Sequence, residues 1–453
     1  MKKLGIVGGG ITGLTCAYRL QNDFEVTLFE KEPEFGGQAR SVTSDQVTVE
    51  SAVSVVAETT YVEFFELMRE IGFNDFIPYE LTGLHAHDRS RSVYYIDVNP
   101  QRIRKLLPGY LKDKPLGWVN SLQLFAFVNK LYTDHEAGRL EGVLVLDAYT
   151  LYPQYKTLIT TVLSILSLIT SVQVKNTTIS HLLNFIYDFQ NNRGTIQPVA
   201  YLFKLFADVT IPKGGVSSYI RRLKQATNAG YVNESEVLSV VRNLDWTVSV
   251  KTANNKEYVF DEVIIATQPF QIASFLKYRS DNERDLFEKL AKAKTKTLVT
   301  NHSDASILGD VGTAIGLVDF RLDYHENTSQ TTIDRRTHFY TAQTLPDHSD
   351  IPLGDYDIYL DTAFTSDNYS IDPQKIYSQH VLAVPHMTIE NRKRFSQMLA
   401  MSGKDNLHFA CAALSTYPTS QEGGVRSANR VAKHILQNDS STTSLSPVVT
   451  VNG

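Results

Sequence analysis

Cysteine is scarce in this chain. The 453 residues include only two cysteines, Cys16 and Cys411, too few for a disulfide framework or a Cys-x-x-Cys metal motif. Low cysteine use is compatible with a reducing compartment, so the sequence predicts a cytoplasmic protein. The 12 histidines are scattered without the spacing of metal ligands, and we expect no metal site.

Long basic runs and long hydrophobic runs are also lacking. The net charge is −5 and no basic tract stands out, so nothing favours a nucleic-acid partner. The apolar stretch 157–174 contains Thr, Ser and Gln, which favours buried core or cavity lining over a membrane-spanning helix. Lys2 and Lys3 before an apolar run resemble a secretion signal. The glycines that follow, and the lack of a small-residue cleavage site, favour a buried strand and turn instead.

The strongest motif follows directly. A short apolar strand, the turn Gly8-Gly9-Gly10-Ile11-Thr12-Gly13, a helix and a second strand succeed one another within residues 4–29. In such a turn Gly8 allows the sharp bend, Gly10 lets the backbone approach a diphosphate, and Gly13 lets the helix pack closely. The helix N-terminus at Ile11 and Thr12 attracts phosphate. The arrangement predicts a dinucleotide site of the Rossmann type.

A carboxylate and a second glycine motif come next. Glu30 ends the second strand, where a carboxylate accepts hydrogen bonds from ribose hydroxyls. The following residues are Lys31-Glu32-Pro33-Glu34-Phe35-Gly36-Gly37-Gln38-Ala39-Arg40. This stretch resembles the second glycine motif of the flavin-containing amine oxidoreductase and phytoene desaturase superfamily. The resemblance is greatest to bacterial proteins described as predicted NAD/FAD-binding oxidoreductases.

The resemblance implies that FAD is bound non-covalently. Gly36-Gly37 and a following basic residue would then line its diphosphate and ribityl chain, and Lys31 is a further candidate contact. Gln38 stands where the superfamily usually has Arg or His, so Arg40 is expected to supply the cation. The remaining contacts implied by the resemblance are Val237, Thr267, Cys411, Gly424 and Val425. Cys411 replaces a usual glycine, and the N-terminus of the last helix, which contains Gly424, would point at the flavin ring.

Three side chains are candidates for the chemistry, again by resemblance. Tyr417 and Ser420 fall where amine oxidases place two aromatic rings beside the flavin, and only Tyr417 is a ring. The incomplete pair favours a bulkier substrate over a small amine, unless an aromatic residue from elsewhere fills the gap. Lys296 lies where amine oxidases have a lysine near flavin N5, and a solvated surface lysine is the alternative.

The sequence predicts an α/β fold, in which a discontinuous Rossmann-type FAD-binding domain is joined to a mixed α+β substrate domain. The predicted FAD-binding domain comprises 1–95, 206–275 and 389–437, the substrate domain 96–205 and 276–388, and the disordered tail 438–453. Strands are predicted at 236–241, 246–250, 258–260, 261–269 and 406–410.

The predicted function is that of an FAD-dependent oxidoreductase, a dehydrogenase, desaturase or oxidase. It would take a hydride from a partly apolar small molecule to flavin N5. Two alternatives share the same motifs: a redox-neutral flavoenzyme, such as a fatty-acid double-bond isomerase or a mutase, and a non-catalytic scaffold stabilised by FAD.

Overall fold

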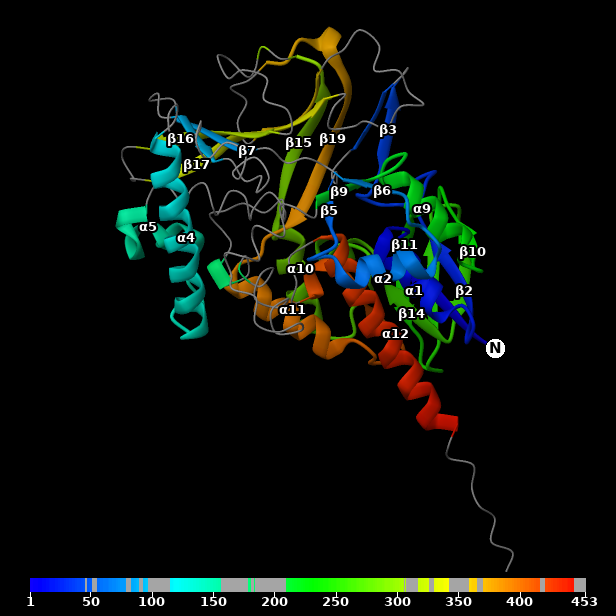
Figure 1. Cartoon of the computed structure of the whole chain (residues 1–453). Helices are drawn as coiled ribbons and strands as arrows, with labels where there is room; N and C mark the ends of the chain where they lie inside the picture. Colours follow the sequence, from blue (N-terminus) through cyan, green and yellow to red (C-terminus); the bar gives the residue numbers. More distant parts are fainter. Residues whose placement is uncertain are drawn as a thin grey trace, which may run out of the picture.

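A computed structural model gives the arrangement of the chain (Figure 1). It describes residues 1–44, 47–50, 55–78, 83–88, 93–96, 115–155, 178–180, 183, 209–304, 306, 317–325, 330–341, 358–364, 370–415 and 420–443.

A five-stranded sheet with all neighbouring strands parallel forms the Rossmann unit. In spatial order the strands are β10 (Gly230–Val232), β2 (Phe24–Phe29), β1 (Lys2–Val7), β14 (Glu262–Ile265) and β20 (Leu407–Phe409). Leu4 and Ile6 of the central strand are fully buried, because a parallel sheet of this kind is covered on both faces.

Two helices pack against each other beside this sheet, α1 (Ile11–Leu20) and α12 (Gln421–Thr443). Leu14 and Ala17 of α1 share one apolar core with Ala428 of α12. Segments from both ends of the chain therefore build the unit together, which confirms the predicted α/β fold with a discontinuous Rossmann-type domain.

A three-stranded antiparallel sheet lies next to the Rossmann unit. Its strands are β11 (Val237–Arg242), β12 (Val248–Thr252) and β13 (Glu257–Phe260), close to the predicted positions. Phe29 at the end of β2 makes edge-to-face contacts with Tyr258 and Phe260 of β13, at ring-centroid distances of 5.0 and 5.8 Å. These contacts join the small sheet to the end of the strand that precedes Glu30.

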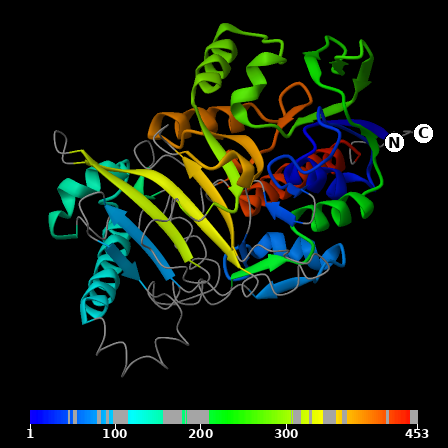
Figure 2. The same ribbon diagram turned by 90° about the horizontal axis from the view of Figure 1, so that it is seen from above.

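The second large element is a seven-stranded sheet, antiparallel except where β16 pairs with β7. Its spatial order is β19 (Ile376–Pro385), β15 (Lys294–His302), β18 (Ile358–Phe364), β17 (Gln330–Thr341), β16 (Leu317–His325), β7 (Gly83–Asp88) and β8 (Val93–Ile96). Seen from above, this sheet lies beside the Rossmann unit (Figure 2).

The domain prediction needs a correction here. The sequence predicts that 1–95 belongs to the FAD-binding domain, yet β7 and β8, which lie at the end of this range, extend the seven-stranded sheet. Gly83 of β7 pairs with Leu317 of β16, far away in the chain. Such a non-local pairing leaves no local pattern in the sequence.

The remaining elements connect these sheets. The helices are α2 (Val62–Glu70), α4 (Pro115–Glu136), α5 (Ala148–Leu151), α9 (Val216–Gln225), α10 (Asp281–Lys292) and α11 (Ile389–Met401). Short 3-10 helices lie at Val145–Asp147, Pro153–Tyr155, Pro269–Ser274, Pro373–Lys375 and Ala412–Leu414. Short strands are β3 (Ser41–Ser44) with β4 (Val47–Glu50), and β5 (Val56–Ala57) and β6 (Phe76–Pro78) on either side of β9 (Val209–Pro212).

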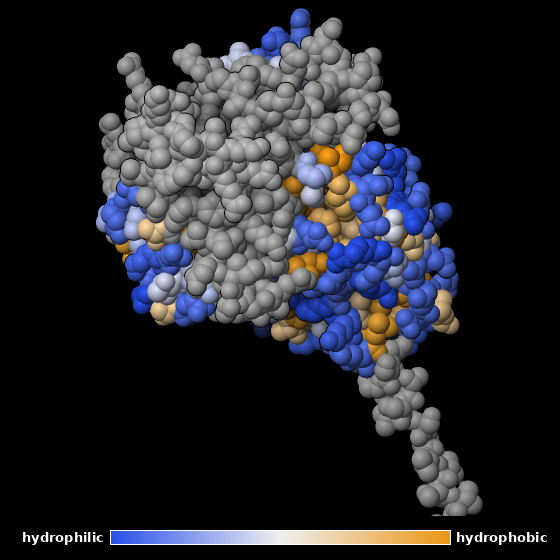
Figure 3. All heavy atoms as spheres, viewed as in Figure 1, coloured by the Kyte–Doolittle hydropathy of each residue, from blue (hydrophilic) through white to orange (hydrophobic). Residues whose placement is uncertain are grey.

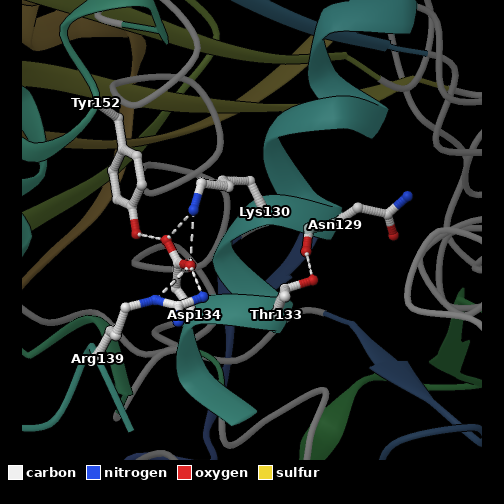
Figure 4. Close-up of polar contacts among 6 residues, drawn as sticks. All are labelled: Asn129, Lys130, Thr133, Asp134, Arg139 and Tyr152. Atoms are coloured by element: carbon white, nitrogen blue, oxygen red, sulfur yellow. Dashed lines mark hydrogen bonds and ion pairs between the residues drawn. The ribbon is translucent and has the colours of Figure 1, made fainter. Parts of the chain in front are cut away.

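A buried carboxylate, Asp134, organises the end of α4 (Figure 4). It accepts hydrogen bonds from Lys130 Nζ at 2.7 Å, Arg139 Nε at 2.8 Å and the Tyr152 hydroxyl at 2.6 Å. Burial favours the neutral acid, but these donors prevail and lower the pKa of Asp134 to about 2. We call these four residues the Asp134 cluster.

The last helix is longer than predicted, because α12 continues to Thr443, past the expected domain end at 437. The predicted disordered tail is therefore wrong for 438–443, and 444–453 and the apolar stretch 157–174 lie outside the described residues. Within the described part of the chain, no helix combines the length and apolarity needed to cross a membrane. The surface in Figure 3 is largely hydrophilic over the described residues, with scattered apolar patches.

Candidate functional site

The first glycine turn has the geometry that the motif predicts. Gly8 has a φ of +111°, and its N–H donates to the Phe29 carbonyl at 2.9 Å. A Cβ on Gly13 would lie 1.9 Å from the Gly8 carbonyl oxygen, so only glycine fits there. A Cβ on Gly10 would lie 3.8 Å from the Gly36 carbonyl oxygen and from Gly37 Cα, so this side of Gly10 faces the second glycine motif.

Glu30 is held at the end of β2 by two backbone amides. Its Oε2 accepts from Gly9 N–H at 2.8 Å and its Oε1 from Glu32 N–H at 3.0 Å. A Cβ on Gly9 would lie 2.9 Å from Glu30 Oε2 and 2.5 Å from the Phe35 ring, so this position also requires glycine. The glycine motif did not predict this requirement. Each carboxylate oxygen keeps acceptor capacity for a further donor, as ribose binding requires.

The two glycine motifs meet in space. Gly36 N–H donates to the Gly9 carbonyl at 2.8 Å, and Gly10 and Gly36 form a parallel bridge. Gly36 and Gly37 have φ values of +133° and +62°, and a Cβ on Gly37 would lie 3.2 Å from Gly10 Cα. Close approach of the two loops therefore explains why both need glycine.

Two cations lie beside this junction. Lys31 is exposed and forms an ion pair with Glu32 at 3.5 Å. Arg40 Nη1 lies 3.8 Å from Glu32, while its Nε is buried and has no hydrogen-bond partner among the described residues. Arg40 thus has an unsatisfied donor where the sequence predicts a cation.

Gln38 and Lys296 both neighbour Ala383 of β19, the edge strand of the seven-stranded sheet. Gln38 Nε2 donates to the Ala383 carbonyl of β19 at 2.9 Å, so its amide joins the glycine motif to that sheet. Lys296 of β15 pairs with Ala383 in the strand register and is exposed. The structure therefore brings Lys296 next to the second glycine motif.

The positions predicted after the strands of the Rossmann unit are also close to the site. Val237 begins β11, near Ser235, whose N–H donates to the Glu30 carbonyl at 3.0 Å. Thr267 follows β14, and its buried Oγ1 has no hydrogen-bond partner in the described chain. Cys411 follows β20, and its N–H donates to Ser427 Oγ at 3.1 Å.

The N-termini of α1 and α12 approach each other closely. A Cβ on Gly424 would lie 2.7 Å from Thr12 Oγ1 and 3.4 Å from Ile11 Cγ2. The side chain of Val425 is fully buried in the core, which leaves only its backbone as a candidate cofactor contact. Two helix N-termini side by side create a positive local potential.

Ser420 has a structural role that the sequence did not predict. Its Oγ accepts from Gly423 N–H at 3.2 Å, so it is the N-cap of α12. Tyr61, just before α2, is hydrogen-bonded to Ser420 and supplies a ring beside it, although its side chain is buried. Tyr417 lies outside the described residues.

Sequence analysis also missed the partners of the first turn of α12. Glu422 is fully buried and accepts from Glu63 N–H at 3.2 Å, Phe64 N–H at 2.8 Å and Arg426 Nε at 2.6 Å. It thereby caps α2. Tyr219 of α9 donates its hydroxyl proton to Gln421 Oε1. Except for the pair of Glu422 and Arg426, which are four residues apart, these partners are too far apart in the chain to leave a signal in the sequence.

Three buried polar atoms lack a partner among the described residues: Arg40 Nε and Thr267 Oγ1, which lie in loops, and Gln421 Nε2, at the start of α12. Buried polar groups are normally hydrogen-bonded, so these atoms fit a bound ligand rich in acceptors. Together with Glu30 and the joined glycine turns, they fit a dinucleotide carrying a diphosphate and a ribose. No group of three or more potential metal ligands is found in the described ranges.

The fold is that of a protein with a Rossmann-type domain. The profile of the flavin-containing amine oxidoreductase family matches residues 11–298, more than half of the chain. The chain therefore belongs to this family and is a flavin-dependent oxidoreductase. Tobacco (Nicotiana tabacum) mitochondrial protoporphyrinogen oxidase is 34% identical over 59 residues, a match that spans 13% of this chain and 12% of the tobacco protein.

Solved structures of similar fold cover nearly the whole chain. Putrescine oxidase bound to putrescine is 12% identical with a TM-score of 0.66, covering 96% of this chain and 99% of its own. The CLA-producing fatty acid isomerase from P. acnes is 12% identical with a TM-score of 0.63, covering 96% and 98%. At such identities these likenesses establish the fold alone.

Proposed function

We propose that the chain binds FAD non-covalently across its two glycine motifs and oxidises a partly apolar small molecule. FAD, when bound, supplies a hydride acceptor at its N5 atom. The observation that carries the proposal is the contact between the motifs, with Gly36 N–H bonded to Gly9 and Glu30 fixed alongside by Gly9 N–H.

Each loop has a role in this proposal. The diphosphate would lie beside Gly10 at the start of α1, where the helix N-terminus favours a bound phosphate. Glu30 would accept hydrogen bonds from the adenosine ribose, and Arg40 would use its unsatisfied Nε on the diphosphate side. The remaining proposed contacts are Gly8, Ile11, Thr12, Gly13, Lys31, Gly36, Gly37, Gln38, Val237, Thr267, Cys411, Gly424 and the backbone of Val425.

The state of the cysteines supports non-covalent binding. Cys16 and Cys411 are free and buried, and burial raises the pKa of each thiol to about 12. Thiols with such pKa values are protonated at neutral pH and are poor nucleophiles. Free thiols also suit the proposed cytoplasmic location.

An apolar surface beside Lys296 supports the proposed substrate class. Leu298 and Val381 pair across β15 and β19, and their side chains are 41% and 61% exposed. Leu298 is two residues from Lys296, so both side chains project from the same face of the sheet. An apolar substrate packed on this face would remove both aliphatic side chains from water.

Flavin release tests the cofactor proposal. The purified protein should be yellow, and heat or acid should release free FAD into the supernatant. Flavin that stays with the acid-precipitated polypeptide would contradict non-covalent binding. The release of FMN alone would contradict the dinucleotide assignment.

Anaerobic mixing tests the reaction. Benzylamine, polyamines and amino acids should not bleach the flavin rapidly, because Ser420 replaces a ring and caps α12. Bleaching by any of them at ordinary turnover rates, about 1–10³ per second, would overturn this expectation.

Unsaturated fatty acids are the second probe, because they fit an apolar face and the similar fold includes a fatty acid isomerase. Lasting bleaching with a desaturated product would support net oxidation. A rearranged product without lasting bleaching would favour the redox-neutral alternative instead.

A further inference from the structure

Gln421 has a buried carboxamide with one end satisfied and the other end free. The residue is 4% exposed, and its Oε1 accepts from the Tyr219 hydroxyl. Its Nε2 has no hydrogen-bond partner among the described residues. An unmade hydrogen bond of a buried polar group costs about 1–3 kcal/mol, so such a group points to a missing partner.

Tyr219 fixes the orientation of this carboxamide. Its side chain is fully buried, and burial raises the pKa of its hydroxyl well above the ordinary value. The phenol therefore keeps its proton, and in the structure its hydroxyl donates to Oε1, which leaves the NH2 group as the free end.

The position of Gln421 indicates what the missing partner is. Gln421 is the first residue of α12, whose N-terminus lies against that of α1 at Gly424 and Thr12. Two helix N-termini and a free NH2 group together favour an acceptor that carries negative charge.

We propose that Gln421 Nε2 donates a hydrogen bond to the pyrimidine carbonyl edge of the flavin, where negative charge gathers on reduction. Tyr219 is the positioning residue that aims the amide. The inference rests on the proposed function, since it requires the flavin ring to lie at the start of α12.

The reduction potential of the bound flavin tests this proposal. Gln421→Met keeps an unbranched side chain of similar length and removes the donor. We expect it to weaken the binding of reduced relative to oxidised FAD about tenfold, which lowers the two-electron potential by about 30 mV. Gln421→Glu keeps the shape but replaces the donor by an acceptor, and it should lower the potential further.

Two more variants complete the experiment. Tyr219→Phe should lower the potential less than Gln421→Met, because the donor is retained but no longer oriented. Gln437→Leu removes a carboxamide from the far end of the same helix and should leave the potential unchanged. Circular dichroism and the flavin content of each variant show whether it is folded and loaded.

The outcomes distinguish a failure of the role proposed for Gln421 from a failure of the proposed function. Wild-type potentials in FAD-loaded Gln421→Met and Gln421→Glu would overturn the role of Gln421 and leave the proposed function intact. A wild-type protein that binds no FAD would overturn the proposed function itself. Equal shifts in Gln421→Met and Gln437→Leu would point to a general effect on α12 and would also overturn the inference.

Discussion

The Asp134 cluster and the first turn of α12 both place polar side chains in the interior, with opposite results. Asp134 receives hydrogen bonds from Lys130, Arg139 and Tyr152 (Figure 4). At α12, Gln421 Nε2 has no partner in the described chain. One polar group is saturated by the protein, and the other is left incomplete.

The difference separates a structural role from a ligand-binding role. A saturated carboxylate holds elements in place, here the end of α4 and the segment that follows it, and offers little to a ligand. An incomplete polar group costs stability until a ligand supplies its partner. In this chain such groups lie beside the glycine motifs, at Arg40 and Thr267, and also in the ion pair of Arg242 and Glu283.

The largest expected effect tests the ligand-binding role proposed for the residues beside the glycine motifs. Glu30→Ala should weaken FAD binding by about 3 kcal/mol, roughly 100-fold in the dissociation constant, because two charge-assisted hydrogen bonds to ribose are lost. Titration of the apoprotein with FAD measures the effect. Glu30→Gln, which keeps an acceptor for Gly9 N–H, should lie between wild type and Glu30→Ala.

Glu34→Ala is the matched control, since this nearby carboxylate is exposed. It should leave the FAD dissociation constant unchanged. If Glu30→Ala and Glu34→Ala bound FAD equally well, the assignment of Glu30 to the ribose would be wrong.

The second largest expected effect tests the structural role of the Asp134 cluster. Asp134→Asn should lower the free energy of unfolding by about 2 kcal/mol at neutral pH, because the depressed pKa of Asp134 contributes stability there. The contribution is present above the ordinary pKa of 3.8 and is lost as the pH falls towards about 2. The stability difference between wild type and variant should therefore shrink below pH 3.8.

Denaturant unfolding across this pH range measures the difference. FAD affinity is the second readout, and Asp134→Asn should leave it unchanged if the cluster is purely structural. A variant that lost FAD affinity without losing stability would break the comparison.

The Rossmann unit could be predicted from sequence because its signals are local. The turn between β1 and α1 needs Gly8 because its φ is +111°, and it needs Gly13 because a Cβ there would meet the Gly8 carbonyl oxygen. Strand, turn and helix are contiguous, so the pattern identifies both the fold and the site. The hairpin of β12 and β13 is local in the same sense and was predicted near its observed position.

The features of the fold and of the candidate site that were not predicted depend on contacts between distant segments of the chain. β7 joins the seven-stranded sheet by pairing with β16, and Glu422 caps α2 from the far end of the chain. The resemblance to amine oxidases places Ser420 beside the flavin, and the structure shows in addition that its hydroxyl accepts a local helix-capping hydrogen bond. Tertiary partners decide such roles, and a single sequence does not contain them.

The smallest expected effect concerns Glu422. This carboxylate is buried and hydrogen-bonded like Asp134, but the shift of its pKa has the opposite sign. Burial raises the pKa of Glu422 above its ordinary value of 4.5, and the hydrogen bonds from Arg426, Phe64 and Glu63 offset this only in part. A raised pKa means that the folded state favours the protonated acid. The stability that this group contributes is present below pH 4.5 and is lost as the pH rises through the raised value.

Glu422→Gln resembles the protonated acid but does not titrate. The free energy of unfolding of Glu422→Gln, relative to that of wild type, should therefore rise as the pH increases from 4.5. This rise should be smaller than the loss of stability expected for Asp134→Asn. Denaturant unfolding of both proteins at several pH values measures the trend. A relative stability that falls with rising pH would show that the ionised carboxylate is favoured, as it is in Asp134. The fold would then favour the ionised form of both Asp134 and Glu422, and the number of hydrogen-bond partners alone would not distinguish their environments.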